Sequence, residues 1–207
     1  MAGEPGGKRV IFPDDIDQWQ ARIVAGTPGN YSYVQGPARE AGMAGSGHIA
    51  FDRDGNIYSA CGTFIQIIDT NGVSRVLAGT PGMAGCSDGP AALATFAGAC
   101  DLAMNKDGVI FVVDEPNVAI RRLERKGDGW QVTTVAGVPG LQGHRDGPAN
   151  QALFMTPFNG IAIGDTGIVY AMDGNWLRKL ENGVVTTLNA GTGSANAFAV
   201  APATGEY

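Results

Sequence analysis

The chain repeats a short glycine-rich segment at intervals of a little over fifty residues. The segment reads IVAGTPG at 23–29, VLAGTPG at 76–82 and TVAGVPG at 134–140, and a weaker copy, TLNAGTG, stands at 187–193. The alanine of its Ala-Gly pair falls at positions 25, 78, 136 and 190, so successive copies lie 53, 58 and 54 residues apart. A fixed period of this length indicates a repeat architecture, in which each unit buries its apolar faces against its neighbours.

Two further sets of residues move in step with this segment. Gly-Pro pairs recur at 36–37, 89–90 and 147–148, each followed at fixed offsets by Ala and then a large apolar residue. An apolar run with a turn in its middle comes next in each unit: IAFDRDGNIY at 49–58, LAMNKDGVIF at 102–111 and IAIGDTGIVY at 161–170. Three sets in register make a chance repeat implausible and define one structural unit.

Each unit contains two hairpin signals. In the first unit they are Asp54-Gly55-Asn56 and Asn71-Gly72, where glycine supplies a positive φ between two apolar runs. The later units turn their second hairpins at Gly127-Asp128-Gly129 and Asn182-Gly183. Four short antiparallel strands every fifty-odd residues, without helical periodicity, predict an all-β fold: a β-propeller of four-stranded antiparallel blades.

Composition agrees with this fold and excludes several classes of protein. The 32 Gly and 11 Pro residues suit turns and crossovers, while 44% hydrophobic and 16% charged residues exclude a disordered chain. A net charge of −6 argues against a nucleic-acid partner. No apolar run is long enough to insert into a membrane, and the first residues lack the apolar core of a signal peptide. We therefore expect a soluble chain of unknown compartment, with the mature part of an exported protein as one possibility.

The basic group and the cysteines are both predicted to have structural roles only. The densest basic group, Arg121, Arg122, Arg125 and Lys126, is predicted to form a solvated strand edge. Cys61, Cys86 and Cys100 are too few and too irregular for a disulfide framework or a zinc site. They are predicted to be small buried residues, although one pair could bridge in an oxidising compartment.

With these repeats the chain resembles the NHL-repeat family of β-propellers. The likeness rests on AGTPG, the GP-x-x-x-A-x-F crossover, the hairpin I-A-x-x-x-x-G-x-I-Y and VVDEPNVAIRR at 112–122. In the last of these, Asp114, Asn117 and Arg121 occupy the marked positions of the pattern, and Asp173, Asn175 and Arg178 nearly repeat them. The first unit has Cys61 in place of the aspartate. We expect these aspartates to bond nearby backbone N–H groups rather than to act in catalysis.

The repeat divides the chain into whole and partial blades. We expect a half-blade at about 8–26, blades at about 47–79, 100–137 and 159–191, and a half-blade at about 196–207. Three arrangements stay open: a closed four-bladed ring, an arc that self-associates or docks on a partner, and a fragment of a longer chain. An open arc would expose strand edges and apolar blade faces.

The residues just before the innermost strands are unusually polar. His48, Asp101, Asn159 and Asn196 stand there, where propellers usually bind ligands at the mouth of the central channel. Related six-bladed lactonases and amidating lyases hold a divalent cation with similar groups, and a cation could activate water. The competing interpretation is that these side chains cap the turns into the strands.

Two functions follow as hypotheses. The first is a non-enzymatic protein-interaction or assembly module, because the repeat is strong and no catalytic motif accompanies it. Its partner would be another protein or a second copy, bound through the half-blade edges, and no cofactor is predicted. The alternative is a metal-dependent, lactonase-like or lyase-like enzyme with its site over the central channel.

Overall fold

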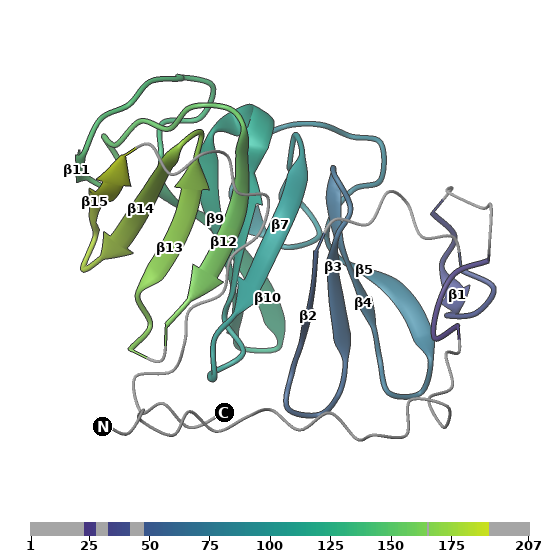
Figure 1. The fold of residues 1–207 in the computed structure, drawn as a ribbon. Helices are drawn as coiled ribbons and strands as arrows, with labels where there is room; N and C mark the ends of the chain where they lie inside the picture. The colour runs from purple at the N-terminus through teal and green to yellow at the C-terminus, as the bar shows by residue number, and fades with distance from the viewer. Residues whose placement is uncertain (1–22, 28–32, 42–47, 165, 191–207) are drawn as a thin grey trace, which may run out of the picture.

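The described part of the chain folds as three antiparallel β-sheets that stand side by side in chain order (Figure 1). The structure is a computed structural model, which describes residues 23–27, 33–41, 48–164 and 166–190. Among these residues the only helical segment is one turn of 3₁₀ helix at Glu115–Asn117. None of the described helices could cross a membrane. The all-β propeller architecture predicted from the repeat is therefore confirmed.

Each sheet is one repeat unit, with its strands hydrogen-bonded in the same order. The first sheet runs β1-β5-β4-β3-β2, with β1 (Gly36–Pro37), β2 (Ile49–Phe51), β3 (Ile57–Ala60), β4 (Phe64–Ile68) and β5 (Val73–Gly79). The second runs β6-β10-β9-β8-β7, with β6 (Gly89–Pro90), β7 (Ala99–Met104), β8 (Ile110–Asp114), β9 (Ala119–Lys126) and β10 (Gly129–Ala136). The third runs β11-β15-β14-β13-β12, with β11 (Gly147–Pro148), β12 (Phe158–Ile163), β13 (Val169–Asp173), β14 (Trp176–Glu181) and β15 (Val184–Ala190).

The fifth strand of each blade was not predicted from the sequence. It is the Gly-Pro pair of the preceding crossover, which pairs with the outermost strand: Gly36 lies opposite Ser74, and Pro37 opposite Val73. Proline has no N–H to donate, so it is tolerated at the open edge of a sheet and not in its middle. The crossover thus adds a short outer strand to each four-stranded blade.

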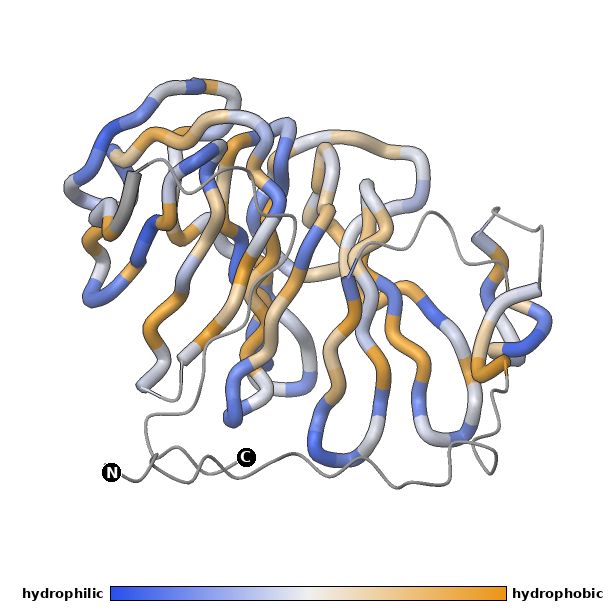
Figure 2. Tube along the Cα trace, in the orientation of Figure 1, coloured by the Kyte–Doolittle hydropathy of each residue, from blue (hydrophilic) through white to orange (hydrophobic). Residues whose placement is uncertain are grey.

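The hairpin turns lie where the sequence placed them. Gly55 and Gly72 adopt φ values of +90° and +75°, which favour glycine over any other residue. At the last hairpin both Asn182 and Gly183 have positive φ, at +50° and +74°, as a two-residue turn of this kind requires. Hydrophilic residues gather at these turns and apolar residues along the strands (Figure 2).

The sheets pack face to face, and two names describe their surfaces. The forward face of a blade is the side that meets the next blade in chain order, and the backward face is the side that meets the previous one. Between the first two blades, the forward face contributes Tyr58, Ile65 and Leu77, and the backward face contributes Leu102, Ile110 and Leu123. Between the second and third blades, the corresponding residues are Ile120 on one side and Ile161 and Val169 on the other.

The crossovers close each of these two cores from one end. Ala94 and Phe96 are fully buried between the first two blades, and Ala152 and Phe154 are fully buried between the next two. These are the Ala-x-Phe residues that follow each Gly-Pro pair in the repeat. They recur because each new blade must be sealed onto the one before it.

Of the remaining predictions from the sequence, some are untested, some are confirmed and some are wrong. The half-blade at 196–207 and most of the one at 8–26 lie outside the described residues, and residues 23–26 are described but are not in a strand. Arg121 was predicted at a solvated edge and is instead fully buried. Cys61 is buried as predicted, but Cys86 is exposed, because it lies in a crossover loop; all three cysteines are free thiols.

Candidate functional site

Two of the four predicted channel residues lie in direct contact. His48 precedes β2, and Asp101 lies in β7, the corresponding inner strand of the next blade. The two strands pack side by side (Figure 1), and His48 Nδ1 lies 2.5 Å from Asp101 Oδ1. The histidine side chain is 45% exposed, whereas the carboxylate is only 5% exposed. The pair therefore joins a buried acid to an imidazole that reaches solvent.

Asp101 is held in place by backbone groups from two blades. Its Oδ1 accepts a hydrogen bond from the N–H of Leu102 at 2.7 Å, and its Oδ2 accepts one from the N–H of Ile161 in β12 at 2.8 Å. Burial raises the pKa of Asp101 above its ordinary value of 3.8, and the bonds from Ile161 and Leu102 and the nearby His48 oppose this rise only in part. One carboxylate thus connects the inner strands of all three blades.

The other two channel residues do not extend this pair into a described cluster. Asn159 lies in β12, half-buried, one residue before the position that corresponds to Asp101. Asn196 falls outside the described residues. Within the residues that the structure describes, no three His, Cys, Asp or Glu side chains converge as a metal site.

The His48–Asp101 pair has a definite chemical capacity. A carboxylate at Nδ1 favours the tautomer that donates from this nitrogen, which leaves the lone pair of Nε2 able to accept a proton or a hydrogen bond. This is one proton-accepting group at the inner edge of the arc. A structural role for Asp101 also receives support, because it accepts hydrogen bonds from N–H groups within two inner strands, β7 and β12.

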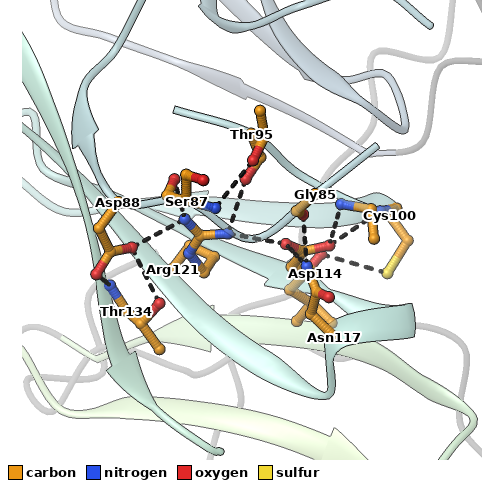
Figure 3. A network of polar contacts seen from close by, with 12 residues as sticks. Gly85, Ser87, Asp88, Thr95, Cys100, Asp114, Asn117, Arg121 and Thr134 are labelled. Carbon is orange, nitrogen blue, oxygen red and sulfur yellow. Dashed lines mark hydrogen bonds and ion pairs between the residues drawn. The ribbon is translucent and has the colours of Figure 1, made fainter. Parts of the chain in front are cut away.

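A second polar arrangement surrounds Arg121, in the middle of the second blade (Figure 3). The guanidinium donates to Asp114 at 3.0 Å, to Asp88 at 2.9 Å, and to the backbone carbonyls of Ser87 and Thr95. It also lies over the Phe96 ring at 5.1 Å. Three of these partners belong to the crossover that precedes the blade, so Arg121 ties the crossover to the sheet.

The two carboxylates of this cluster are satisfied in turn. Asp114 accepts hydrogen bonds from the N–H groups of Ala97 and Gly98 and from the Asn117 amide, at 2.8 to 3.0 Å. Asp88 accepts from the N–H and the hydroxyl of Thr134. The expectation that the repeated aspartates bond backbone N–H groups is therefore confirmed for Asp114, and the arginine is the partner that sequence reasoning missed.

The third blade repeats the arrangement around Arg178. This buried guanidinium pairs with Asp173 and, at 2.8 Å, with Asp146, and it lies 5.1 Å from the centre of the Phe154 ring. Asp146 in turn accepts from Thr187. We call each set, Asp88–Asp114–Arg121–Thr134 or Asp146–Asp173–Arg178–Thr187, an arginine clamp.

The first blade has a neutral network at the same positions. Gln66 replaces the arginine, donates to Ser74 at 2.6 Å and accepts from the Cys61 thiol at 3.5 Å. In the sequence Gln35 and Val76 replace the crossover aspartate and the threonine. The first unit thus differs from the other two at four positions together: Gln35, Cys61, Gln66 and Val76. Comparison of the repeat units could have revealed the clamp from this joint change.

A groove of about 600 Å³ opens between the first two blades at their hairpin ends. Its aromatic residues are Phe51, Tyr58 and Trp130, and the guanidinium of Arg125 lies 5.0 Å from the centre of the Trp130 ring. Asp52 in its wall accepts from the Tyr58 hydroxyl at 2.9 Å, and burial together with this bond raises the pKa of Tyr58 to about 12. These contacts within the wall stabilise the turn and the blade contact.

Comparison with solved structures places the chain among the β-propellers. It is similar to a protein of unknown function from Bacteroides thetaiotaomicron, with a TM-score of 0.58 and 17% identity over 75% of this chain and 42% of that one. It is also similar to an auxiliary nutrient binding protein from Bacteroides ovatus, with a TM-score of 0.53 and 17% identity over 69% and 36% of the two chains. A virginiamycin B lyase from Staphylococcus aureus gives a TM-score of 0.47 and 15% identity over 72% and 43%.

At these identities the likeness shows the fold alone. The chain spans less than half the length of each of these proteins. No family model and no curated protein matches the sequence. The described residues therefore form three blades of a β-propeller.

Proposed function

We propose that this chain is a non-enzymatic protein-interaction or assembly module built from NHL-type repeats, which forms one part of a larger structure. The observation that carries the proposal concerns one position of the repeat. Ile161 and Leu102, on the backward faces of the third and second blades, are 6% and 4% exposed, whereas Ile49, at the same position of the first blade, is 51% exposed. The inner strand β2 of the first blade therefore presents to solvent a position that is buried in the other two blades.

The neighbourhood of Ile49 supports the same proposal. Phe51, two residues along β2 and on the same side of the strand, is also exposed. Side chains of this size are rarely exposed together unless they meet another surface. The docking surface proposed here is thus the inner strand β2 of the first blade, in addition to the half-blade edges expected from the sequence.

The test compares three forms of the full chain in extracts of the organism that makes it. Ile49→Asp places a charge on the exposed face, and Leu93→Asp is the control. Leu93 is highly exposed in a crossover, and Glu40 and Gln151 occupy its place in the other units. We expect wild type and Leu93→Asp to be recovered in one higher-mass assembly, which Ile49→Asp leaves. Recovery of all three as monomers, or of all three in the same assembly, would contradict the proposal.

A folding control accompanies this test. Ile49→Asp should leave the cooperative unfolding of the isolated chain nearly unchanged, because the side chain is already in water. Ile161→Asp at the matching position should lower the free energy of unfolding by about 3 kcal/mol or more, because it buries a charge in the second core. Urea titrations followed by circular dichroism measure both.

A further inference from the structure

The outer hairpin of the second blade is longer than its counterparts in the other two blades. Its strands β9 and β10 have eight residues each, whereas β4 and β5 have five and seven, and β14 and β15 have six and seven. This hairpin contributes to the longer interval of the second unit, 58 residues against 53 and 54. The first and third blades fold without the extra length, and an insertion in one unit of a repeat often belongs to a binding surface.

The extra length puts a tryptophan where the other two blades have a turn glycine. In each blade one carbonyl of the outer hairpin accepts a hydrogen bond, at 2.7 to 2.8 Å, from the N–H of the alanine after the Gly-Pro pair. This carbonyl belongs to Gly72 in the first blade, Trp130 in the second and Gly183 in the third. Arg125 lies opposite Trp130 across the hairpin. Trp130 therefore adds a large side chain at a position that has none in the other blades.

Trp130 and Arg125 both line the groove of about 600 Å³ between the first two blades. The groove at the matching place between the second and third blades has about 440 Å³ and is lined by Gly183 at the tryptophan position. Phe111 in that groove holds the place of Tyr58 in the first one. The outer hairpin thus adds an aromatic wall to one groove only, and the volume of this groove falls in the range of about 300–1,000 Å³ that is typical of ligand sites.

The walls of the first groove combine ring surface with hydrogen-bonding groups of both signs. Its charged side chains nearly balance: Asp52, Asp54, Asp107 and Glu124 against Arg53, Lys106 and Arg125. Among the described residues, the Arg125 guanidinium and the Asp107 carboxylate have no ion-pair or hydrogen-bond partner, so one can donate to a ligand and the other can accept from it. Balanced charge favours a neutral ligand that carries many donors and acceptors.

The turns that form two of the walls are held in place without a ligand. In the first blade Asp52 accepts hydrogen bonds from two backbone N–H groups of its own turn, at 3.0 and 2.8 Å. In the second blade Asn105 does the same, at 2.9 Å in both cases. A preformed wall lowers the entropic cost of binding.

We propose that the groove between the first two blades binds a neutral oligosaccharide, with one sugar ring against the Trp130 side chain. The C–H face of a sugar ring is apolar and packs on an aromatic ring, and its hydroxyl groups both donate and accept. Hydroxyls on adjacent carbons would bond in pairs to the Arg125 guanidinium and the Asp107 carboxylate. This binding goes beyond the proposed function and does not depend on it.

The experiment is isothermal titration calorimetry on the purified full chain. The probes are neutral hexamers of glucose, mannose, galactose and xylose, together with charged hexamers of galacturonic acid and of glucosamine. We expect at least one neutral hexamer to bind with a Kd below about 1 mM, and the charged hexamers to bind at least about tenfold more weakly.

Three variants locate the binding in the groove. Asp107→Ala and Asp128→Ala make the same change at two exposed positions, and only Asp107 lines the groove, although Asp128 belongs to the longer hairpin. We expect Asp107→Ala to weaken binding about tenfold and Asp128→Ala to leave it unchanged. Trp130→Phe keeps an aromatic ring against the first core, where Trp130 also packs, and should weaken binding by a smaller factor because the ring is smaller. Urea unfolding of each variant shows whether it is folded.

Three results would overturn the inference. Absence of binding by every neutral hexamer at about 10 mM would show that the groove is not a carbohydrate site. Tighter binding of a charged hexamer would show that the ligand class is wrong. Equal affinities of wild type, Asp107→Ala and Trp130→Phe would place the binding elsewhere on the molecule. None of these results bears on the assembly lost by Ile49→Asp, so the proposed function is tested separately.

Discussion

At the scale of single residues, one position of the repeat shows how this fold manages buried charge. Arg121 and Arg178 are fully buried, and each has two carboxylate partners and two backbone carbonyls. In the first blade Gln66 occupies the position with neutral partners. Because an unpaired buried charge is far more costly than a neutral network, the arginine and its carboxylates are present together or absent together.

Arg121→Met should destabilise the chain more than the same change at Gln66. Removing the guanidinium leaves the Asp114 carboxylate buried without its cation, which costs about 3–5 kcal/mol. Gln66→Met removes only neutral hydrogen bonds and should cost about 1–2 kcal/mol. Urea unfolding of the two variants measures the difference, and equal losses would show that the clamp does not act as an ion pair.

Asp101→Asn should change how stability depends on pH. Because the pKa of Asp101 is raised in the folded chain, its protonated form stabilises folding fully below about pH 3.8, and this contribution is lost as the pH rises through the folded-state pKa. The asparagine stays neutral and can still accept from the Ile161 N–H. We expect the stability of the variant, relative to wild type, to increase from about pH 3 to pH 7. A pH-independent difference would contradict the assigned shift.

At the scale of elements, the crossover needs glycine at two positions for two different reasons. Gly137 has a φ of +94°, and a Cβ there would lie 2.4 Å from the carbonyl oxygen of Val118. Gly140 has a φ of +79°, but a Cβ there would meet open space. In the first full unit, Gly79 and Gly82 repeat this contrast. The first glycine of AGTPG therefore allows a close backbone approach, whereas the second only permits the turn.

Gly137→Ala should be much more damaging than Gly140→Ala. The first change adds a clash with backbone to an unfavourable φ and should cost more than about 3 kcal/mol. The second costs only the left-handed conformation of alanine, about 1–2 kcal/mol. Thermal unfolding of both variants provides the comparison. A similar loss at the two sites would mean that the backbone near Val118 yields easily.

At the scale of the whole molecule, the fold is a stack in which each blade completes the core of the one before it. Ile49, Leu102 and Ile161 occupy one repeat position, yet only Leu102 and Ile161 have a described blade behind them. At this position exposure is therefore set by the place of the blade in the stack and not by the residue type. This is why the proposed docking surface lies at one end of the arc.

The repeat by itself determined the architecture, because strand period, turn glycines and crossover alanines are local patterns that each unit must satisfy. It placed Gly55, Gly72 and Gly183 at turns. Only the tertiary structure decided that Arg121 is buried, that Gly-Pro forms a fifth strand and that His48 meets Asp101 while Ile49 faces solvent. These outcomes depend on which side chains from distant segments come together and how far they are shielded from water. A local sequence pattern does not encode that proximity.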